Sequence, residues 1–241
     1  MRGLTKRILC LLCVLILGIA AIGCKAADEE GDKVGDGDVK VEDAYNQELA
    51  NYFPIVEGTV LKYYGTAEYG QTLTLNNVTE NKENLVLDFN GEILDVSGGE
   101  GPSRDELLFE TQYEINKDSV IESQMNADRR FSQSIIREQI VLKAPIEEGE
   151  SWEQTVTIDG KEYKAKTTIT EISKDEKGKN LVKTEMTIND IEFYPEDTYK
   201  EIRTFKEGKG LAEFKNTVLL KGPEGVDPAP FDFGYRLFEQ E

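Results

Sequence analysis

The stretch SWEQTVTIDGKEYKAKTTITEI, residues 151–172, indicates how this chain folds. Side chains alternate between the two faces of an extended strand, and apolar residues recur here at even spacings along each arm. Between the arms, Asp159 and Gly160 supply the positive φ angles that a two-residue hairpin turn requires. The stretch is therefore predicted to form a β-hairpin with one apolar face. The residues of that face are Trp152, Val156, Ile158, Tyr163, Ala165 and Ile169.

Comparable runs continue through most of the chain after Pro54, and turn-forming residues separate them. Turns are predicted at 89–92, 177–180 and 207–210, where Gly and Asn cluster. The other apolar faces are predicted to comprise Leu107, Phe109, Thr111, Tyr113 and Ile115 in 106–115, Ile136, Ile140 and Leu142 in 134–143, Val182, Met186 and Ile188 in 180–188, and Ala212, Phe214, Val218 and Leu220 in 210–220.

These runs predict an all-β fold. Parallel strands need crossover segments of a dozen or more residues, and no helix of useful length is expected after Pro54. We therefore expect a single antiparallel sheet, strongly curved or closed into a partly open barrel, because long meanders curl on themselves. The Pro-containing segment 227–238 is predicted to be a closing edge strand. A short helix over 42–53, with Asp43 as its N-cap, is expected to precede the sheet.

The first 24 residues carry the pattern of an export signal. A basic start is followed by an apolar run at 8–22 that is short for a spanning helix. The ending Ala-Ile-Gly-Cys at 21–24 resembles the lipobox of bacterial lipoproteins, although that family more often has Leu at the first of these positions. The resemblance implies that residues 1–23 are a lipoprotein signal peptide and that Cys24 is acylated and becomes the first mature residue.

The rest of the chain divides into a tether and one domain. Residues 24–48 comprise the acylated Cys24, an acidic Gly-rich segment with almost no large apolar group, and the start of the short helix. Such a segment cannot bury enough surface to fold, so a flexible tether is predicted. Residues 49–241 are predicted to form one antiparallel β domain. Because Cys10 and Cys13 lie in the signal, no intrachain disulfide is expected in the mature protein.

The charge of the chain limits its partners. The full sequence has a net charge of −19, and removal of the three basic residues of the signal brings it to −22. A field of this sign repels nucleic acid and anionic head groups. We therefore expect no nucleic-acid partner, and we expect membrane association through the lipid on Cys24 rather than through a basic patch.

The residues that most hydrolases and metal sites use are missing. The sequence has no His, and the mature Cys is expected to carry lipid, which removes imidazole-assisted nucleophiles and Cys/His metal sites. No register of 32–43 fits an EF-hand loop and no phosphate-loop motif is present, so no metal and no cofactor is expected. Carboxylates remain, and Glu57 and Glu148 are the two that recur in one context. We expect no enzymatic activity, and a carboxylate-dependent hydrolase of envelope glycans is the alternative.

The sequence Pro-Ile-x-Glu-Gly occurs at 54–58 and again at 145–149. Pro cannot donate a sheet hydrogen bond, and the Glu-Gly step favours a turn. Three residues after each Gly a large apolar residue is expected to anchor a new strand. We therefore predict two similar β halves, each begun by an entry turn. The structural residues are Pro54, Gly58 and Leu61 in the first half, and Pro145, Gly149 and Trp152 in the second.

Three segments, YFPIVEG at 52–58, LKAPIEEGESW at 142–152 and EGKGLAEFK at 207–215, resemble a functionally uncharacterised family of surface lipoproteins of Gram-positive-type bacteria. This chain has Val-Leu at 60–61 where the first repeat of that family often carries Trp. The resemblance implies a curved antiparallel sheet similar to those of lipoprotein carrier and receptor proteins, and it implies no functional residue.

Together these features predict a non-catalytic protein anchored by lipid to the outer face of the cell membrane. It is expected to bind a hydrophobic ligand, an envelope component or another protein. Besides the hydrolase, the remaining alternative is a purely structural surface spacer.

Overall fold

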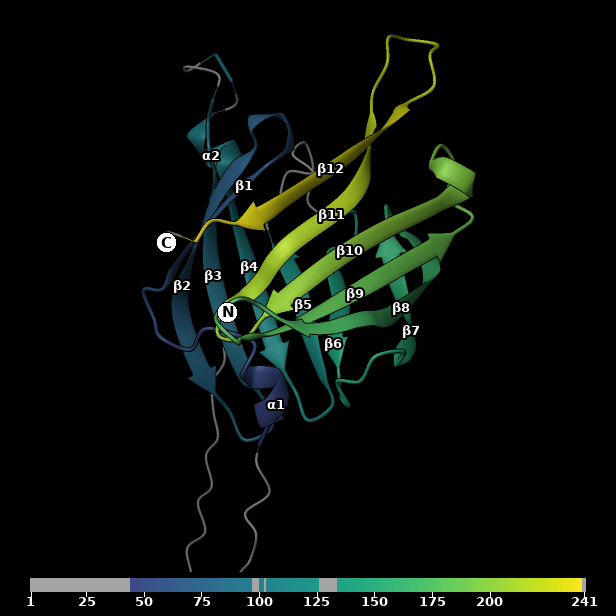
Figure 1. The fold of residues 1–241 in the computed structure, drawn as a ribbon. Helices are drawn as coiled ribbons and strands as arrows, with labels where there is room; N and C mark the ends of the chain where they lie inside the picture. Colours follow the sequence, from purple (N-terminus) through teal and green to yellow (C-terminus); the bar gives the residue numbers. More distant parts are fainter. Residues whose placement is uncertain (1–43, 97–99, 102, 126–133, 240–241) are drawn as a thin grey trace, which may run out of the picture. The chain divides into compact units, whose positions relative to one another are not determined.

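A computed structural model describes residues 44–96, 100–101, 103–125 and 134–239. These residues form one antiparallel sheet of twelve strands that nearly closes into a barrel (Figure 1), which confirms the predicted fold class. The strands are β1 (Val60–Gly65), β2 (Gly70–Glu80), β3 (Leu85–Ile93), β4 (Leu108–Ile115), β5 (Ser119–Met125), β6 (Glu138–Lys143), β7 (Ser151–Ile158), β8 (Lys161–Lys174), β9 (Asn180–Asn189), β10 (Thr198–Lys206), β11 (Gly210–Leu220) and β12 (Ala229–Leu237), and the short helices are α1 (Gln47–Ala50), α2 (Arg104–Leu107), η1 (Thr66–Glu68) and η3 (Pro195–Asp197).

Each half of the sheet is a meander in which consecutive strands pair. β1 to β6 form one half and β7 to β12 the other, and the two halves are joined by the pairing of β1 with β12. The ends of the sheet, β6 and β7, lie close to each other without a backbone ladder between them. The sheet therefore has one closed junction, β1–β12, and one open seam, β6–β7.

The placement of β12 corrects one expectation. Segment 227–238 was predicted to form a closing edge strand, whereas β12 pairs with β11 along its whole length and with β1 at Tyr235 to Leu237. Pro230 is tolerated because it lies near the start of the strand, before the pairs with β1 begin. The last strand of the chain therefore lies in the middle of the sheet.

The predicted hairpin at 151–172 is confirmed. Asp159 and Gly160 have φ angles of 50° and 81°, and Ile158 pairs with Lys161 across the two-residue turn. The hairpin consists of β7 and β8, and Trp152 is buried on its inner face. The turns expected at 177–180 and 207–210 are also present.

The turn predicted at 89–92 is wrong, because these residues lie within β3. Gly91 pairs with Phe109 of β4, and the ring of Phe109 occupies the space next to Gly91. A Cβ at position 91 would lie 2.3 Å from that ring. Asn90-Gly91 therefore makes room for a cross-strand aromatic residue instead of turning the chain.

Two β-bulges change the predicted faces. In the β5–β6 pair the register shifts after Val120, so Leu142 and Gln139 are buried, whereas Ile140 is only partly buried against the core. In the β10–β11 pair the shift falls at Phe205 and leaves Ala212 unpaired. The buried side chains of β11 are therefore those of Leu211, Phe214 and Asn216, whereas Ala212 is displaced by the bulge. Val218 is partly buried against the core on the predicted face, and Leu220 is exposed at the end of the strand.

The short helix is shorter than predicted. It begins at Gln47, and its N-cap is Asn46, whose side chain accepts the Leu49 N–H at 3.1 Å, rather than Asp43. Leu49 and Phe53 are buried in the main core. The ring of Phe53 packs against Tyr113 of β4 and Phe205 of β10, at centroid distances of 4.9 and 6.0 Å. Helix α1 and the residues after it therefore fill one end of the barrel (Figure 1).

Candidate functional site

The repeated Pro-Ile-x-Glu-Gly segments open corresponding strands. Gly58 has φ +80° and Gly149 has φ +91°. The Gly58 N–H donates to the Leu75 carbonyl at 2.8 Å, and the Gly149 N–H donates to the Ile169 carbonyl at the same distance. Both acceptors immediately precede a β-bulge, in β2 and β8 respectively. The two entry turns are thus equivalent parts of two similarly built hairpins, β1–β2 and β7–β8.

The residues that follow the turns also correspond. Leu61 and Trp152 are buried, 5% and 6% exposed, as the first inward residues of β1 and β7. The prolines differ: Pro54 is buried beside α1, whereas Pro145 is exposed. These six positions support the architecture, and of them Leu61 also lines a hollow described below. Cys24 lies outside the described residues.

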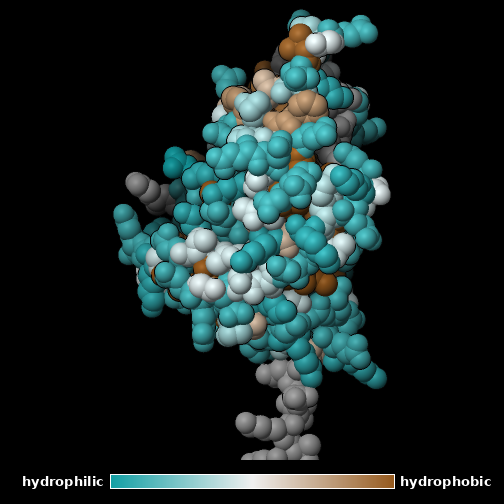
Figure 2. All heavy atoms as spheres, turned by 90° about the vertical axis from the view of Figure 1, so that its right-hand side faces the viewer, coloured by the Kyte–Doolittle hydropathy of each residue, from teal (hydrophilic) through white to brown (hydrophobic). Residues whose placement is uncertain are grey.

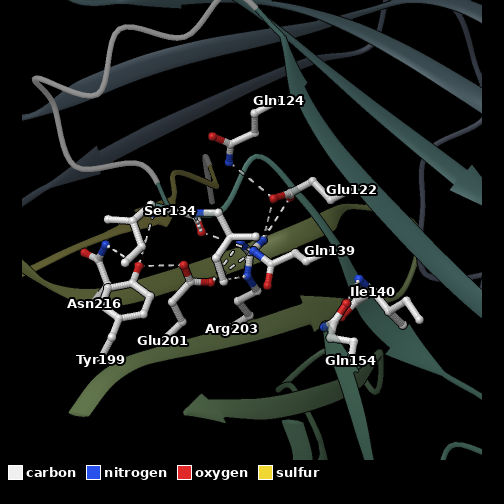
Figure 3. A network of polar contacts seen from close by, with 12 residues as sticks. Glu122, Gln124, Ser134, Gln139, Ile140, Gln154, Tyr199, Glu201, Arg203 and Asn216 are labelled. Carbon is white, nitrogen blue, oxygen red and sulfur yellow. Dashed lines mark hydrogen bonds and ion pairs between the residues drawn. The ribbon is translucent and has the colours of Figure 1, made fainter. Parts of the chain in front are cut away.

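The densest group of polar side chains lies inside the barrel (Figure 3). Arg203 of β10 donates to both carboxylate oxygens of Glu122 on β5 at 2.9 Å, and to Glu201 at 3.1–3.2 Å. All three side chains are at most 4% exposed. The Arg203 guanidinium also lies over the Phe214 ring, 5.1 Å from its centroid. We call this group the buried ion cluster.

Tyrosines complete the hydrogen bonding of the buried ion cluster. Tyr113 donates to Glu122 at 2.8 Å, and Tyr199 donates to Glu201 at 2.6 Å. Burial, reinforced by the neighbouring carboxylates, raises the pKa of both hydroxyls well above the usual value. Burial alone would lower the pKa of Arg203, but the two carboxylates outweigh it and raise that pKa. The cluster is therefore a charged, fully paired bridge between the two halves.

The buried ion cluster was not predicted from the sequence, although a signal for it exists. Tyr199, Glu201, Arg203 and Phe205 occupy alternate positions of one strand, so charged and aromatic residues share one face. On a strand with one buried face, that pattern indicates charges inside the core. Glu122 carries no such local signal, since its partner Arg203 lies 81 residues away.

A glutamine side chain of β7 bridges the β6–β7 seam. Gln154 of β7 accepts the Ile140 N–H at 2.7 Å and donates to the Ile140 carbonyl at 3.0 Å. Its amide thereby satisfies both backbone groups of a β6 residue, as a neighbouring strand would. Near the same seam, Ile136 packs into a second core cluster with residues of β7–β10.

The outer face of β10–β12 and β1 carries an open hollow of about 500 Å³, which we call the strand groove. Gly65 and Gly234 line it without side chains, and the backbones of β1 and β12 approach closely there. Its walls include both charged and apolar groups. They comprise Tyr64, Thr66, Lys200, Ile202, Lys215 and Arg236, among others.

A second open hollow, of about 510 Å³, lies where β10 and β8 end; we call it the lysine groove. Its cations are Lys62, Lys177, Lys179, Lys206 and Lys209. Lys206 is largely covered and contacts Asp175 at 2.7 Å and Glu239. These contacts raise the pKa of Lys206, although burial opposes the shift.

Other kinds of site have little support in the described part of the chain. It contains no group of three or more His, Cys, Asp or Glu side chains arranged to hold a metal ion. None of its helices combines the length and apolar character that crossing a membrane requires. The face turned to the right in Figure 1 is mainly hydrophilic, with isolated hydrophobic residues (Figure 2).

No protein-family model matches this chain, and a search of curated proteins finds no relative. Two solved structures resemble it at 13% and 11% identity, with TM-scores of 0.43 and 0.38. One is a candidate exported protein with a YmcC-like fold from Bacteroides fragilis, and the other is a candidate lipoprotein from Parabacteroides distasonis. In each case 77% of this chain and 96% of the other chain are covered. Neither similarity is close enough to assign a function.

Proposed function

We propose that this protein is a lipid-anchored extracytoplasmic binding module that takes its partner on the outer face of β1 and β10–β12 and catalyses no reaction. The signal pattern and Cys24 support the anchor. The strand groove and the lysine groove supply concave surface for a partner.

The observation that carries this proposal is the filled interior of the barrel. A hydrophobic ligand carried inside a curved sheet needs an apolar cavity. Here a continuous core runs from α1 to β12, and the buried ion cluster places three charged side chains between the halves. The space that a carrier protein would give to an acyl chain is occupied by packed side chains, so the outer grooves are the better site.

The hydrolase alternative has weaker support. Glu122 and Glu201 are both bound to Arg203 and are covered, which leaves no room for a sugar between them. In the strand groove the acidic pair is Glu213 and Asp232, and Asp232 pairs with Thr217, four residues along β11 from Glu213. Their backbone positions are thus about 13 Å apart along the strands. Glycoside hydrolases hold two carboxyl groups about 5–9.5 Å apart, so this pair is not held at that spacing by the backbone.

Two experiments test the proposal. Cys24→Ser is expected to move the protein from the membrane fraction to the soluble fraction, and retention in the membrane would exclude the lipid anchor. A photo-cross-linking residue at Thr217, in the strand groove, is expected to form adducts in intact cells, whereas the same residue at Glu162 on β8 serves as control. Adducts at neither position would exclude the binding role and favour a structural spacer.

A further inference from the structure

Among the described residues, positive charges are over-represented in the two grooves. Eight of the 20 described lysines and arginines line them, compared with five of the 37 described aspartates and glutamates. The full chain nevertheless has a net charge of −19. A local excess of cations inside two hollows of an otherwise negative surface indicates a site for negative charge.

Four of these cations have no ion-pair partner within the described residues. They are Lys62, Lys177 and Lys209 in the lysine groove and Arg236 in the strand groove, and all four are exposed. The others are paired; for example, Lys179 contacts Glu207 at 2.9 Å. The paired lysines hold the groove walls in place, while the four unpaired cations are available to a ligand.

The two grooves form one track. Lys62 lines the lysine groove and Tyr64 lines the strand groove, and these residues lie two positions apart on the outward face of β1. Phe238 belongs to the lysine groove, and its ring packs against that of Tyr64 at a centroid distance of 5.5 Å. Both rings are about half exposed. An apolar step therefore lies between two sets of cations.

We propose that this track binds an extended chain bearing repeated phosphate groups; the inference rests on the proposed binding role and names its ligand class. Lysine ammonium groups act as compact point charges that suit phosphate. A row of separated cations requires a ligand with anions repeated along its length. The half-exposed Tyr64–Phe238 pair lies between the two sets of cations, so the bound chain passes over an apolar surface there.

The shape of the site favours a chain over a membrane surface. Both grooves are hollows of about 500 Å³, and the strand groove is lined by glycine backbone. A flat bilayer contacts mainly the rim of a hollow, whereas a single chain can follow its length and contact cations on both walls. From Lys200 to Lys206 the site extends six residues along β10, or about 20 Å, which accommodates several phosphate units.

Inorganic polyphosphate is a suitable probe, and the mature chain with Cys24→Ser is a suitable protein because no acyl group interferes. Binding measured by titration calorimetry is expected to weaken as salt rises. The variant K62Q/K177Q/K209Q should bind at least 10-fold more weakly, and adding R236Q should weaken binding further. The control K82Q/K166Q/K221Q changes three exposed lysines outside the grooves, and hence alters net charge equally; it should change affinity less than 2-fold.

Several results would overturn the inference: no binding of polyphosphate, equal losses in both triple variants, equal affinity for polyglutamate, or binding confined to anionic lipid vesicles. Thermal melting of each variant checks that it remains folded. If adducts form at Thr217 but polyphosphate does not bind, the ligand class is wrong and the binding role stands. Retention of Cys24→Ser in the membrane would exclude the anchor without affecting the titration.

Discussion

The two places where the halves meet are built differently. At the β1–β12 junction, three residue pairs form a backbone ladder, and Thr66 extends it through hydrogen bonds to both backbone groups of Gly234. At the β6–β7 seam, no ladder forms, and Gln154 makes the equivalent two bonds to Ile140 alone. Similar halves can thus be joined once by main chain and once by side chains. At the β1–β12 junction, a substitution that adds bulk between the backbones should therefore lower the stability most. Near the β6–β7 seam, stability should depend on the hydrogen-bonding and charged groups of the side chains.

The largest effect is expected from Gly65→Val at the β1–β12 junction. A Cβ at position 65 would lie 2.2 Å from the Gly234 carbonyl oxygen, which is backbone and cannot move aside. We expect a loss of about 4 kcal/mol or more in the free energy of unfolding, measured in urea. Gly178→Ala, in an open turn at φ +79°, is the control and should cost about 1 kcal/mol. Equal losses would show that β1 and β12 do not approach so closely.

The next effect concerns the buried ion cluster, which links β5 beside the seam to β10. Arg203→Met leaves the Glu122 and Glu201 carboxylates buried without a counter-charge, and should cost about 3–5 kcal/mol. Lys200, also on β10, forms a more exposed ion pair with Glu185 of β9, so Lys200→Met should cost less than about 1 kcal/mol. The triple change Arg203→Met, Glu122→Gln and Glu201→Gln should recover part of the loss. No recovery would mean that packing, not charge, causes it.

Alkaline pH should destabilise both the β1–β12 junction and the buried ion cluster. Burial raises the pKa of Tyr63 and Tyr235 near β1–β12 and of Tyr113 and Tyr199 in the buried ion cluster. The unfolded chain loses these protons near pH 10 while the folded chain keeps them, so their stabilisation is complete below pH 10 and declines above it. At pH 11 each tyrosine should account for about 1.4 kcal/mol.

Urea unfolding between pH 8 and 11 measures this decline. Tyr63→Phe and Tyr113→Phe should each flatten it by a similar amount. If the decline in stability with pH were unchanged in either variant, the tyrosine replaced there would not contribute to it.

The last comparison concerns the two side-chain bridges, Gln154 and Thr66. Gln154→Ala leaves both backbone groups of Ile140 without partners at the seam and should cost about 2 kcal/mol. Thr66→Val should cost less than about 0.5 kcal/mol, because the β1–β12 ladder remains. Hydrogen exchange at the Ile140 amide should quicken in the Gln154 variant alone. If Thr66→Val proves as costly, the ladder contributes less than its geometry indicates.

Local patterns were sufficient for the fold class but not for several faces and turns. The β7–β8 hairpin was predictable because Asp159-Gly160 and the alternation act within one hairpin. Gly91 was predicted to lie in a turn because its own segment shows no other reason for a glycine. The reason is the ring of Phe109, which lies on the next strand and leaves no space for a side chain at position 91. Bulges likewise depend on the partner strand, so the burial of Gln139 in place of Ile140 could not be predicted from their own segment.

The candidate site was less accessible to sequence reasoning than the fold. The turn and anchor residues were recognised because they repeat, and the structure places them in equivalent hairpins. The grooves collect cations from positions as distant as Lys62 and Arg236, which are neighbours only because β1 pairs with β12. A chain with a net charge of −19 gave no indication of a basic track, because net charge averages over the whole surface.

The central position of β12 has a consequence for how the protein is made. Ribosomes deliver β1 early and β12 last, and Tyr63 must find Leu237 across almost the entire domain. Until the final strand emerges, the edge of β1 is open to pairing with other chains. Lys62, which projects outward from that edge, is a charge of the kind that discourages such pairing. Truncation of the last dozen residues should therefore expose a nascent edge and promote aggregation, rather than simply shorten the protein.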